Sequence, residues 1–156
     1  MAGHENFLGY ISWLLRVLGT SAERVRKEDG LEDRLRLQKA AFLLKHLGVA
    51  PFTLFNFNLY VRGPYSPDLA ECYYHLEAET ALVEAKLDRE KEELLNWFIS
   101  HDSKWLEIAS SIISIKRTYR EIDEDEVYSI LKMSKPWVDQ QKFTAICREL
   151  KNRRLI

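Results

Sequence analysis

Arg62-Gly63-Pro64-Tyr65-Ser66-Pro67 is the stretch that decides how the middle of the chain folds. Its two prolines and its glycine restrict the backbone to a rigid turn, because proline fixes its own φ angle and glycine supplies conformations that other residues avoid. The preceding residues 51–61 are rich in aromatic and β-branched residues with partial alternation, which predicts one short strand or a β-hairpin. Ser66 is suited to be a helix N-cap and Pro67 to be the first helical residue. We therefore expect an extended segment that the glycine and the first proline end, followed by a helix to about Glu79.

On both sides of this turn, apolar residues recur at helical spacing, which predicts a mainly α, compact bundle of about six or seven helices. The first two helices are expected at residues 5–18 and 31–47, joined by a charged connector at residues 20–30. The apolar residues of the second helix cover most of its circumference, so this helix is expected at the centre of the core. Further helices are expected at residues 88–100, 103–119, 124–133 and 138–152, with Asp88, Ser103 and Asp123 as caps.

The length and composition indicate a single domain spanning residues 1–156. An apolar content of 46% is ample for one core, and no repeat or long linker divides the chain. The net charge of −1 disfavours a general nucleic-acid-binding protein, which is usually basic. Cys72 and Cys147 match no metal or redox motif and are expected to be reduced and buried. Residues 1–6 have no basic leader and residues 7–18 are too short to span a bilayer, so we expect a cytoplasmic protein without membrane contact.

The side chains beside the turn are candidates for binding a protein partner. Tyr60, Arg62 and Tyr65 are large hydrogen-bonding groups, and such groups make good anchors on a rigid backbone because little entropy is lost when they bind. The alternative is a purely structural corner, in which Tyr65 packs as a lid and Ser66 only caps a helix. Lys39 has mostly apolar neighbours and is expected to be partly buried, with a carboxylate or a carbonyl near the turn as its partner.

The sequence provides little support for catalysis or metal binding. Cys72 and His75 are three residues apart on a predicted helix, but a structural zinc site needs two further ligands, so we expect no metal. The acidic residues 123–126 open a helix, where the helix dipole favours carboxylates. The common hydrolase, kinase, protease and nucleotide-binding motifs do not occur in the sequence. We therefore expect a non-enzymatic protein that uses no cofactor.

The two C-terminal helices suggest an alternative function. Their short connector through Pro136 and the basic end of the last helix have the outline of a helix-turn-helix nucleic-acid-binding regulator. Acidic residues at the start of the first of these helices would repel phosphate, which weakens the alternative. The residues that would contact nucleic acid are Lys142, Arg148, Lys151, Arg153 and Arg154.

Three segments resemble one known family. Residues 35–44 (LRLQKAAFLL) are similar to the helix that opens Panacea (SocA-like antitoxin) domains and the related YwgA-like prokaryotic proteins. Residues 57–69 (FNLYVRGPYSPDL) resemble the family's Gly-Pro-Tyr-Ser segment, and residues 131–137 (LKMSKPW) resemble its later Pro-Trp element. The resemblance implies a helical domain with a small β element that binds proteins without a cofactor. In some members of the family this binding neutralises a toxin or presents it for proteolysis.

Together these observations favour a protein-interaction module that is antitoxin-like or associated with a phage or plasmid. Its expected partner is a protein such as a cognate toxin, and self-association as a homodimer is left open. The residues expected to form the contact surface are Lys39, Tyr60, Arg62, Tyr65 and Ser66.

Overall fold

The computed structural model describes residues 2–156, with side chains described from Phe7 onward. It confirms a mainly helical fold with one β-hairpin. The hairpin pairs β1 (Asn58–Tyr60) with β2 (Gly63–Tyr65), and the short 3-10 helix η1 (Phe52–Leu54) precedes it. The α-helices are α1 (Ala2–Val17), α2 (Ala22–Arg26), α3 (Leu31–His46), α4 (Pro67–Tyr74), α5 (Arg89–Ile99), α6 (Ser103–Thr118), α7 (Glu124–Ser134) and α8 (Gln140–Asn152). Within residues 2–156, none of these helices has the length and apolar character needed to cross a bilayer.

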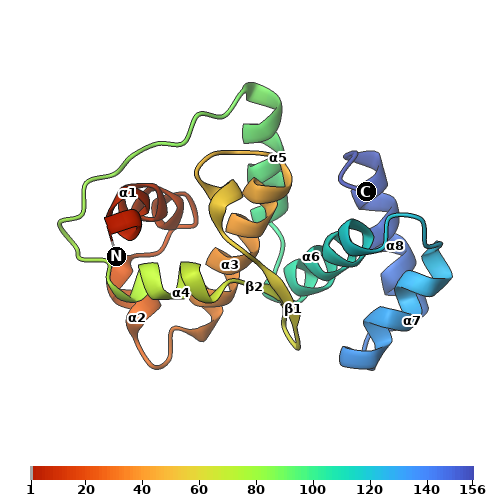
Figure 1. Ribbon diagram of the computed structural model, residues 1–156. Helices are drawn as coiled ribbons and strands as arrows, with labels where there is room; N and C mark the ends of the chain where they lie inside the picture. The colour runs from red at the N-terminus through yellow and green to blue at the C-terminus, as the bar shows by residue number, and fades with distance from the viewer. Residues whose placement is uncertain (1) are drawn as a thin grey trace.

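Helices α3 and α6 pack against each other and both contact strand β2. Figure 1 shows the hairpin between these two helices, with α1, α2 and α4 on one side of the molecule and α7 and α8 on the other. The continuous run from Leu37 to Leu44 in α3 is buried, which confirms the predicted central position of this helix. The hairpin is therefore held by the two most buried helices of the fold.

Pro64 lies inside strand β2, so the expectation that Gly63-Pro64 ends the extended segment was wrong. The pairing places Asn58 opposite Tyr65, Leu59 opposite Pro64, and Tyr60 opposite Gly63. Proline has no N–H group, so it fits only a strand position that requires no donor. The carbonyl of Pro64 instead accepts a hydrogen bond from Lys39 of α3. A lysine of a neighbouring helix thus supplies the hydrogen-bond donor that a further strand would otherwise provide.

Gly63 is required at the turn for two reasons. Its φ angle is +97°, and it follows Val61 and Arg62, which both have negative φ. This is the pattern of a hairpin turn closed by a left-handed glycine. Gly63 also packs so closely that an added Cβ would lie 3.1 Å from Ser111 Oγ and 3.2 Å from Lys39 Cε.

Two expectations about the segments around the hairpin are corrected. The connector at residues 20–30 contains helix α2, which is capped by Ser21 and buries Val25 in the core. Helix α4 ends at Tyr74 instead of near Glu79. The chain then turns at residues 77–80 and passes along α1, where the backbone N–H of Val83 donates to the carbonyl of Gly9 (Figure 1). Docking of this loop on α1 thus replaces the last predicted turn of the helix.

The helix caps were mostly predicted correctly. Asp88 and Asp123 cap α5 and α7 as expected. Asp102 caps α6 in place of Ser103, which is the first residue of that helix. Helix α8 begins two residues later than predicted, at Gln140, because Asp139 accepts the hydrogen bond of its first turn.

The Ser66→Ala substitution is expected to lower the free energy of unfolding by about 1 kcal/mol. The buried Ser66 Oγ accepts a hydrogen bond of 3.2 Å from the backbone N–H of Leu69, and alanine leaves that N–H without a partner. Urea denaturation measures the change. Ser21→Ala, which removes the cap of the short and more exposed α2, is the control and is expected to have a smaller effect. Equal effects would show that burial adds nothing to the cap.

Candidate functional site

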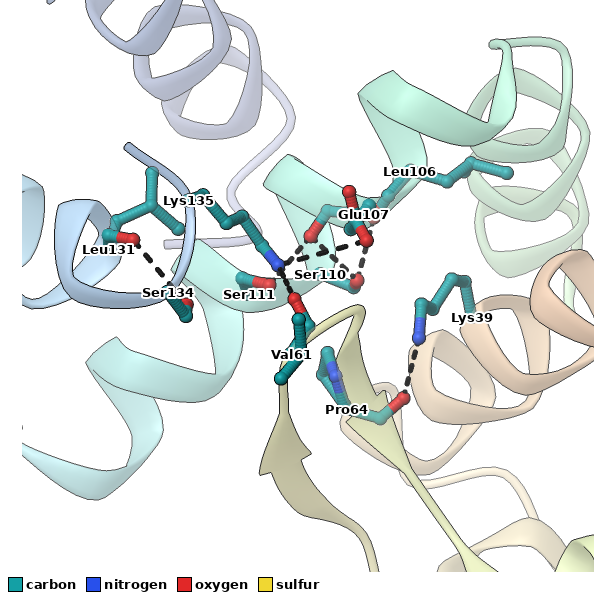
Figure 2. A network of polar contacts seen from close by, with 10 residues as sticks. All are labelled: Lys39, Val61, Pro64, Leu106, Glu107, Ser110, Ser111, Leu131, Ser134 and Lys135. Atoms are coloured by element: carbon teal, nitrogen blue, oxygen red, sulfur yellow. Dashed lines mark hydrogen bonds and ion pairs between the residues drawn. The ribbon is translucent and has the colours of Figure 1, made fainter. Parts of the chain in front are cut away.

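Two buried lysines hold the hairpin turn from opposite sides. Lys39 Nζ of α3 donates a hydrogen bond of 2.8 Å to the Pro64 carbonyl. Lys135, directly after α7, donates to the carbonyl of Val61. Figure 2 shows the two ammonium groups reaching the turn from different elements. Lys39 was expected to be partly buried, with a carboxylate or a carbonyl near the turn as its partner; the partner is a carbonyl and the burial is nearly complete.

Glu107 of α6 provides the negative charge between these lysines. Its carboxylate lies 3.8 Å from Lys135 Nζ. Burial lowers the pKa of Lys39 to about 7, with Glu107 opposing and Lys135 adding to this shift. Burial also lowers the pKa of Lys135, although Glu107 opposes this shift too. One carboxylate therefore compensates two buried ammonium groups only in part.

The backbone at the start of α4 is fixed by Gln38. The Gln38 side chain donates from Nε2 to the Ser66 carbonyl at 3.0 Å, and its Oε1 accepts from the Ser66 N–H at 2.8 Å. Gln38 and Ser66 are both fully buried. Together with Lys39 on the same helix, Gln38 fixes the chain on both sides of Tyr65.

A cleft of about 260 Å³ opens beside the turn. Its walls come from α3, the hairpin turn, the start of α6 and the segment after α7. Lys104 Nζ lies 4.4 Å from the ring centroid of Trp137, which forms part of one wall. The lining residues are Leu35, Lys39, Val61, Arg62, Ser103, Lys104, Glu107, Ser134 and Trp137.

Exposed apolar side chains lie next to this cleft. Val61 is 72% exposed, Tyr60 49% and Trp137 47%. Tyr60 contacts Tyr65 edge-to-face, with ring centroids 5.7 Å apart, so its ring is supported on one side. We call the exposed side chains of Tyr60, Val61, Arg62 and Trp137, at the turn and beside the cleft, the hairpin face.

The structure separates the five predicted contact residues into two groups. Tyr60 and Arg62 are exposed and Tyr65 is half-buried, so their side chains reach the surface. Lys39 and Ser66 are buried behind it and position the turn. The sequence interpretation missed the roles of Gln38, Lys104 and Glu107. Lys135 and Trp137 lie in the segment that resembles the family's Pro-Trp element, but the sequence analysis did not place this segment beside the turn.

Three of the basic residues near the C-terminus lie beside acidic or aromatic side chains. Lys151 forms an ion pair of 3.0 Å with Glu124, and the Arg153 guanidinium lies 4.5 Å from the ring centroid of Trp97. Arg153 and Arg154 also border a surface hollow that contains two glutamates of α5. Lys142 and Arg148 are exposed on α8. Carboxylates and an aromatic ring are thus the neighbours of Lys151, Arg153 and Arg154, three of the five residues predicted to contact nucleic acid.

The two cysteines are buried and free, which confirms the sequence-based expectation. Burial raises the pKa of Cys72 to about 11 and that of Cys147 to about 12, so both remain thiols at neutral pH. His75 makes its contact with the carbonyl of Glu71 in its own helix, at 2.7 Å. Across the described part of the chain, no three histidine, cysteine, aspartate or glutamate side chains come together in a metal-binding arrangement.

The arrangement as a whole suits molecular recognition. The turn is fixed by hydrogen bonds to its backbone carbonyls from Lys39 and Lys135, so the side chains of Tyr60 and Arg62 are displayed from a rigid support. The adjoining cleft adds a cationic and aromatic wall. No family model, curated protein or solved structure matches this chain.

Proposed function

We propose that this chain is a non-enzymatic, antitoxin-like protein-interaction module that binds its partner through the hairpin face. The observation that supports the proposal is an exposed aromatic and apolar surface on a turn whose backbone is anchored from within. Tyrosine, tryptophan and arginine, which dominate the binding energy of protein interfaces, are all present on this face.

The anchoring of the turn favours binding because it reduces the entropy lost on association. Lys39 and Lys135 bond the carbonyls of Pro64 and Val61, and Gly63 packs against α3 and α6. The hairpin therefore does not have to become ordered when a partner arrives. Side chains such as Val61, which is mostly exposed, would lose water contacts when covered by the partner.

The partner we propose is a protein, such as a small toxin, and the proposed location is the cytoplasm. The two buried thiols fit a reducing compartment, where cysteines stay unpaired. The partner's complementary surface would have an apolar centre that covers Val61 and Tyr60, with polar groups around it that meet Arg62.

The Val61→Asp substitution is expected to reduce partner recovery by about 10-fold, because a carboxylate would be buried in an apolar contact. The measurement is affinity capture from the native host after mild cross-linking, with quantitative mass spectrometry of the proteins recovered. Tyr60→Ala is expected to reduce recovery of the same proteins. Tyr119→Ala is the matched control, since Tyr119 is equally exposed but lies at the opposite end of α6 from the cleft.

Equal recovery by the wild type, the two hairpin variants and the control would contradict the proposal. Circular dichroism and the urea midpoint of each variant are compared first. All three substitutions are at exposed side chains, so the folded fraction is expected to be unchanged. A loss of recovery with an unchanged midpoint then reports the contact itself.

A further inference from the structure

We propose that the cleft beside the hairpin turn is a receptor for a carboxylate, which an acidic side chain of the protein partner inserts between Arg62 and Lys104. The inference rests on the proposed function and names the chemistry of the partner. The charges of the cleft favour such a ligand. Three of its lining residues, Lys39, Arg62 and Lys104, have cationic side chains, whereas Glu107 alone among the lining residues has a carboxylate.

This local excess of positive charge is unusual for the chain, whose net charge is −1. Lys135 adds to this excess, because its ammonium group lies 3.8 Å from the carboxylate of Glu107 and takes up part of its negative charge. A buried cation without full compensation is costly, and a nearby anion reduces that cost. An incoming carboxylate would therefore be attracted to the cleft and would stabilise the groups that line it.

Lys39 has hydrogen-bonding capacity to spare. Its ammonium group has three N–H donors. Among the described residues, the acceptor bonded to its Nζ is the Pro64 carbonyl, at 2.8 Å. The side chain is only 2% exposed, yet it lines the cleft. The remaining donors of this buried ammonium group would be satisfied by an acceptor that enters from the cleft.

The size and shape of the cleft favour a carboxylate over a larger or more highly charged anion. Its volume of about 260 Å³ suits one short side chain. Glu107 within the lining would repel a dianionic phosphate more strongly than a single carboxylate. The guanidinium of Arg62 can bond a carboxylate with two parallel N–H groups, and Trp137 offers a flat wall for the methylene groups of the same side chain.

The position of the cleft favours a partner protein as the source of the carboxylate. Val61, Arg62 and Trp137 belong both to the hairpin face and to the lining of the cleft. A polypeptide that covers the exposed side chain of Val61 therefore passes the mouth of the cleft. An acidic residue on that polypeptide would reach Arg62 and Lys104 without further movement of the hairpin.

The test uses two blocked tripeptides, acetyl-Gly-Glu-Gly-amide and acetyl-Gly-Gln-Gly-amide, added to the isolated protein. The readout is the indole N–H resonance of Trp137 in ¹H–¹⁵N spectra, assigned with Trp137→Phe. The glutamate peptide is expected to shift this resonance, because Lys104 lies over the Trp137 ring and would move towards the carboxylate. The glutamine peptide, which has the same shape without the charge, is expected to leave it unchanged.

Variants of the two exposed cations test the geometry. Lys104→Gln and Arg62→Gln are each expected to weaken binding of the glutamate peptide by about 5-fold. Lys142→Gln, an exposed lysine on α8, is the control and is expected to have no effect. Identical titrations with the two peptides would overturn the proposal. Binding of acetate or inorganic phosphate that is as tight as that of the glutamate peptide would overturn the assignment to a partner's side chain.

Affinity capture of the partner with the Val61→Asp and Lys104→Gln variants distinguishes a failure of the carboxylate receptor from a failure of the proposed function. Loss of the partner with Val61→Asp, but full recovery with Lys104→Gln, would overturn the carboxylate receptor and leave the interaction module standing. If the glutamate peptide binds but capture does not depend on Val61, the proposed hairpin face is wrong and carboxylate recognition by the cleft is supported. Loss of the partner in both variants supports both proposals.

Discussion

Replacing Gly63 by alanine is expected to lower the free energy of unfolding by about 3 kcal/mol. Two costs add at this position. The φ angle of +97° is one that residues with a Cβ rarely adopt. The added methyl group would also lie 3.1 Å from Ser111 Oγ, 3.2 Å from Lys39 Cε and 3.3 Å from the Glu107 carbonyl. The turn would have to move away from α6, which would lengthen its hydrogen bonds to Lys39 and Lys135.

Gly48→Ala is the matched control for this prediction. Gly48 has a φ angle of +75°, and no heavy atom lies within 4 Å of the position of its added Cβ. Its substitution therefore introduces backbone strain without a steric contact and is expected to cost about 1 kcal/mol. Urea denaturation of both variants measures the difference. Equal losses of stability would show that the close approach of the turn to α6 contributes nothing.

Most helices could be predicted from the sequence because the information that specifies them is local. Apolar periodicity located the helices, and single capping residues such as Asp88 and Asp123 fixed their first turns. Helix α2 was missed because its five residues bury one apolar side chain, Val25, and so show no periodicity. The end of α4 was missed because it depends on the docking of a distant loop on Gly9.

Pro64 shows why the hairpin was predicted less well. Proline is normally evidence against a strand, and only the register with Leu59 makes it acceptable here. The role of Lys39 could be anticipated, because a lysine among apolar residues of a helix needs a polar partner and the turn offers carbonyls. The role of Lys135 could not, since it bonds a carbonyl 74 residues earlier in the chain. Contacts of this kind follow from the packing of α7 against α6, which no local pattern encodes.

The exposed residues of the turn could therefore be predicted from the local sequence, whereas most of the buried residues that support them could not. Residues displayed by the turn, such as Tyr60 and Arg62, were recognised because they are adjacent to it in sequence. The groups that make the turn rigid and the cleft cationic come from helices α3 and α6, from the turn itself and from Lys135 directly after α7 (Figure 2). The charge of the cleft is thus a property of the assembled fold, because it depends on side chains that are far apart in the sequence.

The stability of the protein is expected to rise by about 2 kcal/mol between pH 7 and pH 9 through Lys39. Burial lowers the pKa of this lysine from 10.5 to about 7. Below pH 7 both the folded and the unfolded chain hold the proton, so the folded state bears the full cost of the buried charge. Above pH 7 the folded protein releases the proton, while the unfolded chain keeps it until the pH approaches 10.5. The unfolded state then binds more protons than the folded state, and the free energy of unfolding increases with pH.

The Lys39→Met variant tests this assignment, because methionine keeps an unbranched side chain only one atom shorter than that of lysine and removes the titrating group. Its free energy of unfolding is measured by urea denaturation at half-unit steps from pH 6 to pH 9. Subtracting it from that of the wild type largely cancels the contributions of the other ionisable groups, which the two proteins share. The difference is expected to change by about 2 kcal/mol in favour of the wild type as the pH rises from 7 to 9. For Lys142→Met, at an exposed position, the free energy of unfolding is expected to change with pH in parallel with that of the wild type. If the free energy of unfolding of Lys39→Met also runs parallel to that of the wild type, the assignment is contradicted. A positive result would mean that at neutral pH the hairpin is held by a lysine that is only partly protonated, so that an anion in the cleft would favour its charged form and bind more tightly below pH 7 than above it.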